Sequence, residues 1–327
     1  MTRAEDFLED RYQIEKEIGR GGLSTVWKAR DKRLDRTVAI KEIRLGEKFQ
    51  DETMTGLFRR EIDIMKNLHH PGLPSVYDVF QEDNNLFIIM TYIEGESLDH
   101  VIRSRGAQEQ KQVIEWGKQL CDILMYLHSR IPPIIYGDLK PSNIMLLPWG
   151  QLMLIDFGSS FELGENNRYH LVTQGFSPPE QYAGSVDERS DIYSLGMTLY
   201  QLLTGVSVSA LSTELKPVRQ INPAIDKKLE QIIKKCTQIN PSLRFQSVKK
   251  LNSALNSLSG GKAHVMMKYI RSTANMLKNF GKQQETKNIS LNSAETEANF
   301  YFYDSEIINY NAKLLLRLQN DIENTKW

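Results

Sequence analysis

The sequence is poor in cysteine: only Cys121 and Cys236 occur among its 327 residues. Two widely separated cysteines exclude the disulfide framework that small secreted domains use. Each lies in an apolar pattern of helical spacing. We therefore expect two buried thiols in a reducing compartment.

The sequence also lacks a net charge, a long apolar run and a leader segment. Lysine plus arginine and aspartate plus glutamate number 41 each, so no excess charge favours a nucleic acid or an anionic membrane. No stretch reaches the ~18–20 apolar residues of a membrane-spanning helix. Met1–Asp10 carries acidic residues and no apolar core, unlike a signal peptide. We therefore expect a cytoplasmic protein with no transmembrane segment and no nucleic-acid partner.

Internal repeats and low-complexity blocks are absent as well, and what the sequence does contain is a change of pattern along the chain. Tyr12–Ile43 alternates apolar and polar residues with two interruptions, which predicts three antiparallel strands. Gly56–Leu68 has helical spacing, and Ser75–Gln81 and Asn85–Tyr92 again read as strands. Residues 12–93 are therefore predicted to form a small antiparallel sheet with one helix.

Long helical patterns dominate after Gly95. They cover Glu109–Ser129, Asp187–Thr204 and Asp226–Gln238. A β-rich lobe at 12–93 followed by an α-rich lobe at 94–258 predicts an α+β fold with two lobes and a cleft between them.

Two further segments flank these lobes. Residues 1–11 are expected to be a short lead-in, and residues 259–327 a C-terminal extension. The extension has two amphipathic helical stretches, Ala263–Phe280 and Ser305–Asn324, separated by the polar run Gly281–Asn299. We expect the extension to pack on the lobes, to bind a partner protein or to self-associate, with disorder as the alternative.

The first candidate functional segment is the glycine cluster Gly19–Val26, which lies between two strand patterns. Glycines at a hairpin tip let main-chain N–H groups approach phosphate oxygens without a Cβ in the way. A dinucleotide-binding fingerprint would need a helix to follow at once. The same cluster could also be no more than a turn.

A second candidate is Lys41, which closes the apolar strand Val38–Lys41. A lysine in a strand can simply be solvated. The predicted helix Gly56–Leu68, however, supplies Glu61, and a Lys41–Glu61 pair could aim the ammonium group at nucleotide phosphates.

The strongest pattern lies in the second lobe, where Asp138, Lys140 and Asn143 are followed by Asp156 at the end of an apolar strand. Phosphoryl transfer from a nucleotide needs Mg²⁺ held by oxygen ligands, which Asn143 and Asp156 can offer. It also needs a carboxylate that orients the attacking hydroxyl, for which Asp138 is the candidate, and Lys140 can stabilise charge on the transferred group. Any one of these residues alone could be a helix cap or a turn residue. Together, in this order, they indicate a phosphotransferase.

These motifs resemble those of the eukaryotic-type (Hanks-type) serine/threonine protein kinases, a family also found in bacteria. The resemblance covers about residues 12–258 and implies the bilobal protein kinase fold, with ATP and Mg²⁺ as cofactors, Mn²⁺ as a substitute, and proteins as substrates. It implies that Lys41, Glu61, Asp138 and Lys140 are catalytic and that Asn143 and Asp156 bind the metal. Nucleotide-binding positions are implied at Ile18, Gly19, Arg20, Gly21, Gly22, Val26, Ala39, Lys41, Met90, Thr91, Ile93 and Asn143.

The same resemblance implies contacts that build a platform for a peptide substrate. Glu180, in a Pro-Pro-Glu motif, is expected to pair with Arg244. Asp191 is expected to brace Tyr136–Asn143, the catalytic loop that the resemblance implies. Thr173 is expected to hydrogen-bond near Asp138 and Lys140, a feature that goes with serine or threonine acceptors.

The sequence departs from the family pattern at three positions. Ser24 stands where a third glycine is common, and Tyr136 and Gly137 replace the usual His-Arg before Asp138. We expect Tyr136 to pack against Phe157. The arginine normally pairs with a phosphorylated residue of the activation segment, which the resemblance places at Asp156–Glu180. Its absence therefore predicts a kinase that is not switched on in that way.

Two other functions compete with a protein kinase. A nucleotide-binding pseudokinase-like scaffold that acts through its C-terminal extension would be expected to lack Lys41, Asp138 or Asp156. A small-molecule kinase would not be expected to carry the Pro-Pro-Glu motif, Asp191 and Arg244. A signalling protein kinase that phosphorylates serine or threonine, including its own, therefore fits the sequence best.

Overall fold

The computed structural model describes residues 2–21, 24–45, 61–82, 84–164, 172–210 and 215–258. All of them belong to the unit Met1–Lys262. The amphipathic stretches predicted in the C-terminal extension lie outside the described residues.

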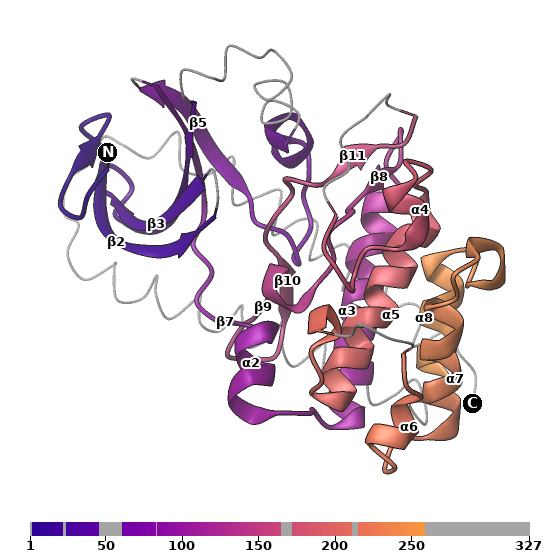
Figure 1. The fold of residues 1–327 in the computed structure, drawn as a ribbon. Coiled ribbons are helices and arrows are strands. Elements are labelled where there is room, and N and C mark those ends of the chain that lie inside the picture. The colour runs from indigo at the N-terminus through magenta and orange to yellow at the C-terminus, as the bar shows by residue number, and fades with distance from the viewer. Residues whose placement is uncertain are drawn as a thin grey trace, which may run out of the picture. The chain divides into compact units, whose positions relative to one another are not determined.

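The N-terminal lobe is a six-stranded antiparallel sheet (Figure 1). The strands follow the spatial order β1-β2-β3-β4-β6-β5. They are β1 (Phe7–Leu8), β2 (Tyr12–Arg20), β3 (Ser24–Asp31), β4 (Arg36–Arg44), β5 (Val76–Glu82) and β6 (Asn85–Thr91). Strands β2 to β6 confirm the sequence prediction, whereas β1 lies in the segment expected to be only a lead-in.

Alternation along the strands gives the sheet two apolar faces. One face carries a cluster of its own, in which β1 buries Leu8 beside Tyr12, Trp27 and Ile40. The opposite face, with Ala39, Ile43, Ile88 and Met90, joins the core that continues into the helical lobe. Residues 61–66 are helical and turn Glu61 and Met65 to the buried side, as the period of the predicted helix requires; Leu68, two residues beyond the helix, is also buried. Residues 56–60 of that predicted helix lie outside the described residues.

The second lobe is mainly helical. Its helices are α2 (Leu98–Arg105), α3 (Gln110–His128), α4 (Pro179–Tyr182), α5 (Glu188–Thr204), α6 (Val218–Ile221), α7 (Lys227–Cys236) and α8 (Val248–Asn256). Asp187 caps α5 and Asp226 caps α7 by accepting main-chain N–H groups, which explains why both helices begin where the sequence predicts. Within the described ranges, no helix combines the length and apolar character needed to cross a membrane.

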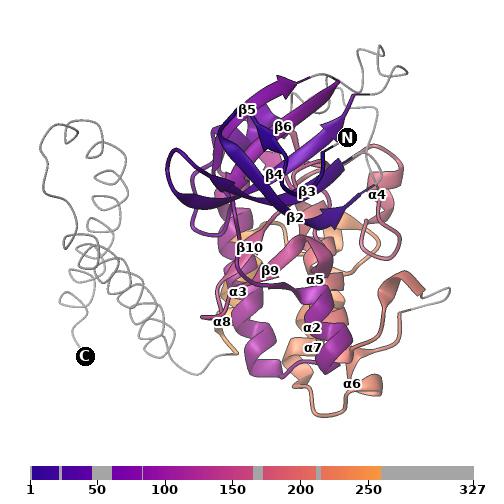
Figure 2. The same ribbon diagram turned by 90° about the vertical axis from the view of Figure 1, so that its left-hand side faces the viewer.

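Short strands connect the helices of this lobe. They are β7 (Glu96–Ser97), β8 (Ile134–Ile135), β9 (Ile144–Leu146), β10 (Leu152–Leu154) and β11 (Phe161–Glu162). Three 3-10 turns accompany them: η2 (Pro141–Asn143), η3 (Val208–Ala210) and η4 (Pro241–Leu243). In both ribbon views the hairpin β9–β10 lies between the N-terminal sheet and helices α3 and α5 (Figures 1 and 2).

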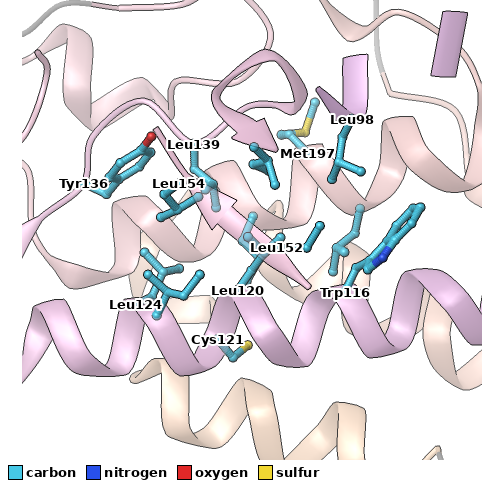
Figure 3. Packing of buried hydrophobic residues seen from close by; sticks show 14 of the residues in the cluster. Leu98, Trp116, Leu120, Cys121, Leu124, Tyr136, Leu139, Leu152, Leu154 and Met197 are labelled. Carbon is cyan, nitrogen blue, oxygen red and sulfur yellow. The ribbon is translucent and has the colours of Figure 1, made fainter. Parts of the chain in front are cut away.

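The core of the second lobe forms around α3. Trp116, Leu120 and Leu124 of this helix point toward Leu152 and Leu154 of β10 (Figure 3). Cys121 lies on α3 and Cys236 ends α7, and both are fully buried free thiols, as predicted. Burial raises the pKa of both thiols above the ordinary range, so they are unreactive at neutral pH.

Candidate active site

The hairpin β9–β10 brings Asn143 and Asp156 to the same end of two neighbouring strands. Ile144 pairs with Leu154, and just beyond this pair the Ile155 N–H donates to the Asn143 carbonyl at 3.1 Å. Asn143 therefore precedes one strand where Asp156 follows the other. Asn143 and Asp156 are thirteen residues apart in sequence, and the antiparallel pairing of β9 with β10 brings them together.

The loop that carries Asp138 is anchored by Asp191 of α5, as predicted. Its buried carboxylate accepts the N–H groups of Tyr136 and Gly137, both at 2.9 Å. His128 at the end of α3 lies on the same carboxylate, with Nε2 2.8 Å from Oδ2. Sequence reasoning missed His128, because nothing in the local pattern around it points to α5. Three groups thus fix one carboxylate, which in turn fixes two successive peptides of the loop.

Asp138 lies in a closed network with Lys140, Asn143 and Thr173. Lys140 Nζ lies 2.7 Å from Asp138 Oδ2 and donates to Thr173 Oγ1 at 3.0 Å. Thr173 Oγ1 donates to Asp138 Oδ1 at 2.7 Å, and Asn143 Nδ2 donates to Oδ2 at 2.9 Å. Because Lys140 occupies a lone pair of the threonine hydroxyl, the hydroxyl hydrogen is left to point at Asp138. The expected contact of Thr173 with this aspartate and lysine is present.

Lys41 lies between two carboxylates from different lobes. Its Nζ is 2.6 Å from Glu61 Oε1 and 3.3 Å from Asp156 Oδ1. Burial alone would lower the pKa of Lys41, but the two negative charges raise it above the ordinary value. Burial raises the pKa of Asp156 less than the charge of Lys41 and the N–H of Gly158 lower it, so this carboxyl titrates below its usual range. Both groups are therefore charged at neutral pH.

The glycine cluster forms the turn between β2 and β3. The Gly21 N–H donates to the Ser24 carbonyl at 2.7 Å, which closes the hairpin tip. The Arg20 guanidinium pairs with Glu17 on its own strand, with Nε 2.9 Å from Oε1, and Ile18 is 43% exposed. The Arg20 side chain is therefore engaged by Glu17, and the implied phosphate contact would fall to its main chain. Gly22 lies outside the described residues.

The positions implied for the adenine ring lie on the face of the sheet that joins the core of the second lobe, and in the segment that begins at the end of β6. Ala39 and Met90 belong to the core cluster that joins the lobes, and the partly buried Val26 packs against it. The Thr91 N–H donates to the Ser75 carbonyl at 3.0 Å, so only the carbonyl of Thr91 could take part in binding adenine. Ile93 follows the end of β6 and is half-buried.

The donor set of Asn143 and Asp156 fits a hard cation such as Mg²⁺. The Asn143 amide nitrogen donates to the Asp138 carbonyl at 3.0 Å and to its carboxylate, so the metal ligand would be the amide oxygen, which also accepts from the Ser142 hydroxyl at 3.4 Å. Mg²⁺ is commonly held by one or two protein oxygens, with water and phosphate oxygens completing its shell. In the part of the chain that the structure describes, no cluster of three or more His, Cys, Asp or Glu side chains forms another metal site.

The motif that closes the activation segment is anchored by a buried ion pair. Arg244 Nη1 lies 2.5 Å from Glu180 Oε1, and the Arg244 side chain is fully buried. Its guanidinium also donates to the main-chain carbonyls of Gln238, Arg189 and Ile239. The predicted Glu180–Arg244 pair is therefore present, and its buried charge is satisfied by hydrogen bonds.

The two departures before Asp138 have distinct structural reasons. Tyr136 is buried and its ring meets Phe157 edge-on, with centroids 5.4 Å apart at 88°, as expected. Gly137 has φ 77°, and a Cβ there would lie 2.6 Å from the Ser159 carbonyl oxygen. In this backbone, a side chain at position 137 would be strained and would also clash.

Comparison with known proteins identifies the class that this fold represents. Residues 12–256 match the family described as "Protein kinase domain", and the chain belongs to that family. Known proteins with similar sequences include bacterial serine/threonine-protein kinases, which confirms the resemblance drawn from the motifs.

Two relatives illustrate the similarity. The chain is 31% identical to serine/threonine-protein kinase PrkC of Bacillus subtilis over 266 residues, which are 76% of this chain and 41% of PrkC. It is 32% identical to serine/threonine-protein kinase PknB of Mycobacterium leprae over 275 residues, covering 78% of this chain and 44% of PknB. The chain thus spans less than half the length of these relatives.

The fold prediction is confirmed by solved structures. The crystal structure of the PknI kinase domain of Mycobacterium tuberculosis superimposes with a TM-score of 0.64 at 22% identity, covering 79% of this chain and 99% of that one. The C20A_R136A double mutant of the same domain gives a TM-score of 0.65 at 22% identity, covering 80% and 100%. At this identity the similarity shows the two-lobed kinase fold.

Proposed function

We propose that this protein is an ATP- and Mg²⁺-dependent protein kinase that transfers the γ-phosphate to serine and threonine hydroxyls, including its own. The observation that carries the proposal is the network in which Asp138 lies next to Lys140 and Thr173, on a loop shared with Asn143. A carboxylate held in this way can orient a substrate hydroxyl and accept its proton.

The roles of the other residues follow from their charges and positions. Lys41, held by Glu61, would bind nucleotide phosphates through its ammonium group. Asn143 and Asp156 would hold Mg²⁺, which would neutralise phosphate charge when bound. Lys140 would stabilise the negative charge of the transferred group while it keeps Thr173 oriented. Gly19, Gly21 and the main chain of Arg20 would cover the phosphates.

The choice of serine and threonine rests on two supports. Thr173 and Lys140 form the contact that the family resemblance associates with these acceptors. The relatives that are 31% and 32% identical to this chain over the aligned residues are named serine/threonine kinases. Binding of a partner protein, or self-association, through residues 259–327 stays a prediction from the sequence.

The test is to incubate the purified protein with γ-labelled ATP, Mg²⁺ and peptides that offer serine, threonine or tyrosine as the only hydroxyl. Label is expected on serine and threonine peptides and on the protein itself, and it should be lost when EDTA is added. Label on tyrosine alone would contradict the proposed acceptor. Nucleotide binding without transfer to any peptide would instead favour the scaffold function.

A further inference from the structure

Three successive residues of the catalytic loop each accept one hydrogen bond from the activation segment and the helix that closes it. Ser160 Oγ donates to the Tyr136 carbonyl at 3.0 Å, near the start of the segment. Thr173 Oγ1 donates to the Asp138 carboxylate at 2.7 Å. Gln181 Nε2 donates to the Gly137 carbonyl at 2.9 Å, just after the segment ends. All three donors are neutral, so none of these contacts needs a phosphate group.

The Gln181 contact is the one that fixes the peptide directly before Asp138. The Gly137 N–H is already bound to Asp191 at 2.9 Å, so Gln181 holds the other polar group of the same residue. Gly137 adopts φ 77°, which costs glycine little. Because glycine has no Cβ, its backbone can also adopt other conformations easily. Two opposing hydrogen bonds remove that freedom.

Gln181 is itself well supported. It is 3% exposed and belongs to α4, directly after Glu180. Glu180 is fixed by the buried guanidinium of Arg244 and accepts a hydrogen bond from Ser190 at 2.9 Å. The amide of Gln181 therefore reaches the catalytic loop from a rigid base, which is what a positioning contact requires.

We propose that Gln181 is a positioning residue that holds the Gly137 peptide, and through it Asp138, in the geometry for phosphoryl transfer without phosphate on the activation segment. This inference rests on the proposed kinase activity. In family members with an arginine at position 137, a pair between that arginine and a phosphate group orders the loop. Here the neutral amide of Gln181 would order it instead.

The test compares Gln181→Met with Gln119→Met. Methionine keeps the length of the glutamine side chain and removes its donors. Gln119 is the matched control because its Nε2 also donates to the carbonyl of a glycine with positive φ, Gly150, at 3.1 Å, but on the turn between β9 and β10. Both variants lose a hydrogen bond that an amide side chain donates to a glycine carbonyl, and Gln119→Met also loses the bond that Gln119 Oε1 accepts from the Leu152 N–H.

Gln181→Met is expected to lower kcat about tenfold, as the loss of one buried hydrogen bond implies, while KM for ATP stays unchanged. Gln119→Met is expected to keep kcat within about twofold, because its contact is remote from Asp138. Gln181→Glu, whose carboxylate cannot donate to a carbonyl at pH 7, is expected to lose at least as much kcat as Gln181→Met. An unchanged kcat in either Gln181 variant would overturn the proposal. So would a Gln181→Met variant whose nucleotide affinity and melting temperature fall far below those of Gln119→Met, since that pattern marks a general structural role.

Amide hydrogen exchange, measured without nucleotide on the same proteins, separates this inference from the proposed function. Exchange at residues 136–138 should speed up in Gln181→Met and stay unchanged in Gln119→Met, whereas Leu152, whose N–H binds Gln119, should respond only in the control. If the wild-type protein transferred no phosphate, the proposed kinase function would be contradicted. Exchange at 136–138 would still decide whether Gln181 holds the loop, and unchanged exchange there would overturn that role.

Discussion

The ammonium group of Lys41 lies 2.6 Å from the carboxylate of Glu61, and the Glu61 side chain is only 3% exposed. The two residues come from β4 and from the helical residues 61–66, so their contact joins the sheet to its helix. Neither charge could remain in this place without the other or another counter-ion.

Replacing Lys41 tests this pair. Lys41→Met should reduce phosphoryl transfer roughly a hundredfold, because it removes the cation expected at the phosphates. It should also lower stability by ~3 kcal/mol, because Glu61 loses its buried partner. Glu61→Gln leaves Lys41 beside Asp156 and should cost only about tenfold in rate. Initial rates and urea unfolding measure both effects.

Lys66 provides the control for these substitutions. It lies on the same short helix, is 53% exposed and pairs with Asp63 at its surface. Lys66→Met should change neither rate nor stability measurably. A Lys41→Met variant that transferred phosphate as fast as Lys66→Met would contradict the role proposed for Lys41.

Gly137 and Gly150 give a matched pair for backbone strain. Both have positive φ, 77° and 88°, but a Cβ at Gly150 meets nothing within 4 Å, whereas one at Gly137 meets the Ser159 carbonyl at 2.6 Å. Gly150→Ala should cost ~1 kcal/mol from the left-handed backbone alone. Gly137→Ala should cost clearly more and should also reduce the transfer rate, because the clash moves the loop that carries Asp138. Equal unfolding free energies for the two variants would show that the close approach to Ser159 is not present in solution.

The neutral contacts of the activation segment predict activity without phosphate on it. Protein that has been treated with a phosphatase, and freed from it, should show a linear progress curve from the first minute. A lag that disappears after preincubation with ATP would show that phosphorylation switches the enzyme on, and would contradict the expectation drawn from Gly137. Mass spectrometry of the segment during the reaction relates the rate to its phosphorylation.

Asp31 predicts a defined pH dependence of stability. It is fully buried and accepts two hydrogen bonds from Arg11, at 3.0 and 2.8 Å. Burial alone would raise the pKa of Asp31, but the Arg11 contacts and the N–H groups of Leu34 and Arg33 bring it below its ordinary value. A carboxyl with a lowered pKa in the folded state stabilises above its ordinary pKa, ~3.9, and loses this contribution as the pH falls through the folded-state value.

Asp31→Asn should therefore unfold ~2 kcal/mol more easily than wild type at pH 7. The difference should stay constant down to about pH 5 and narrow as the pH falls below about 4. Asp35→Asn, at a side chain that is 78% exposed, should differ little from wild type at any pH. A difference for Asp31→Asn that widens in acid would contradict this assignment. Urea unfolding at each pH gives the comparison.

The catalytic loop shows which part of the site the sequence could predict. Asp138, Asn143 and Asp156 offer the carboxylate and the oxygen ligands that phosphoryl transfer requires, and their order along the chain resembles that of the kinase family. The long-range contacts of Asp191 and Arg244 could be predicted only because the resemblance to a family supplied their partners. In each case the structure contains the expected contact.

Gln181 and His128 show what the sequence could not predict. Their partners are the carbonyl of Gly137 and the carboxylate of Asp191, which lie on other segments of the chain. No local period or spacing marks such contacts. Strand β1 was missed for a different reason: a strand of two residues is too short to show alternation, and it forms because Leu8 is buried against the outer face of the sheet.

The most direct test of the proposed activity is the rate of γ-phosphate transfer by Asp138→Asn, measured beside its affinity for ATP with Mg²⁺. The amide oxygen of asparagine can still accept the hydrogen bond from Thr173, but its NH₂ group replaces the oxygen that faces Lys140 and Asn143. Asparagine also cannot take the proton of a substrate hydroxyl. Transfer should fall at least about a hundredfold while ATP affinity stays within about twofold of wild type. A variant that transfers phosphate at nearly the wild-type rate would contradict the role of Asp138, and with it the central claim that this loop performs the chemistry.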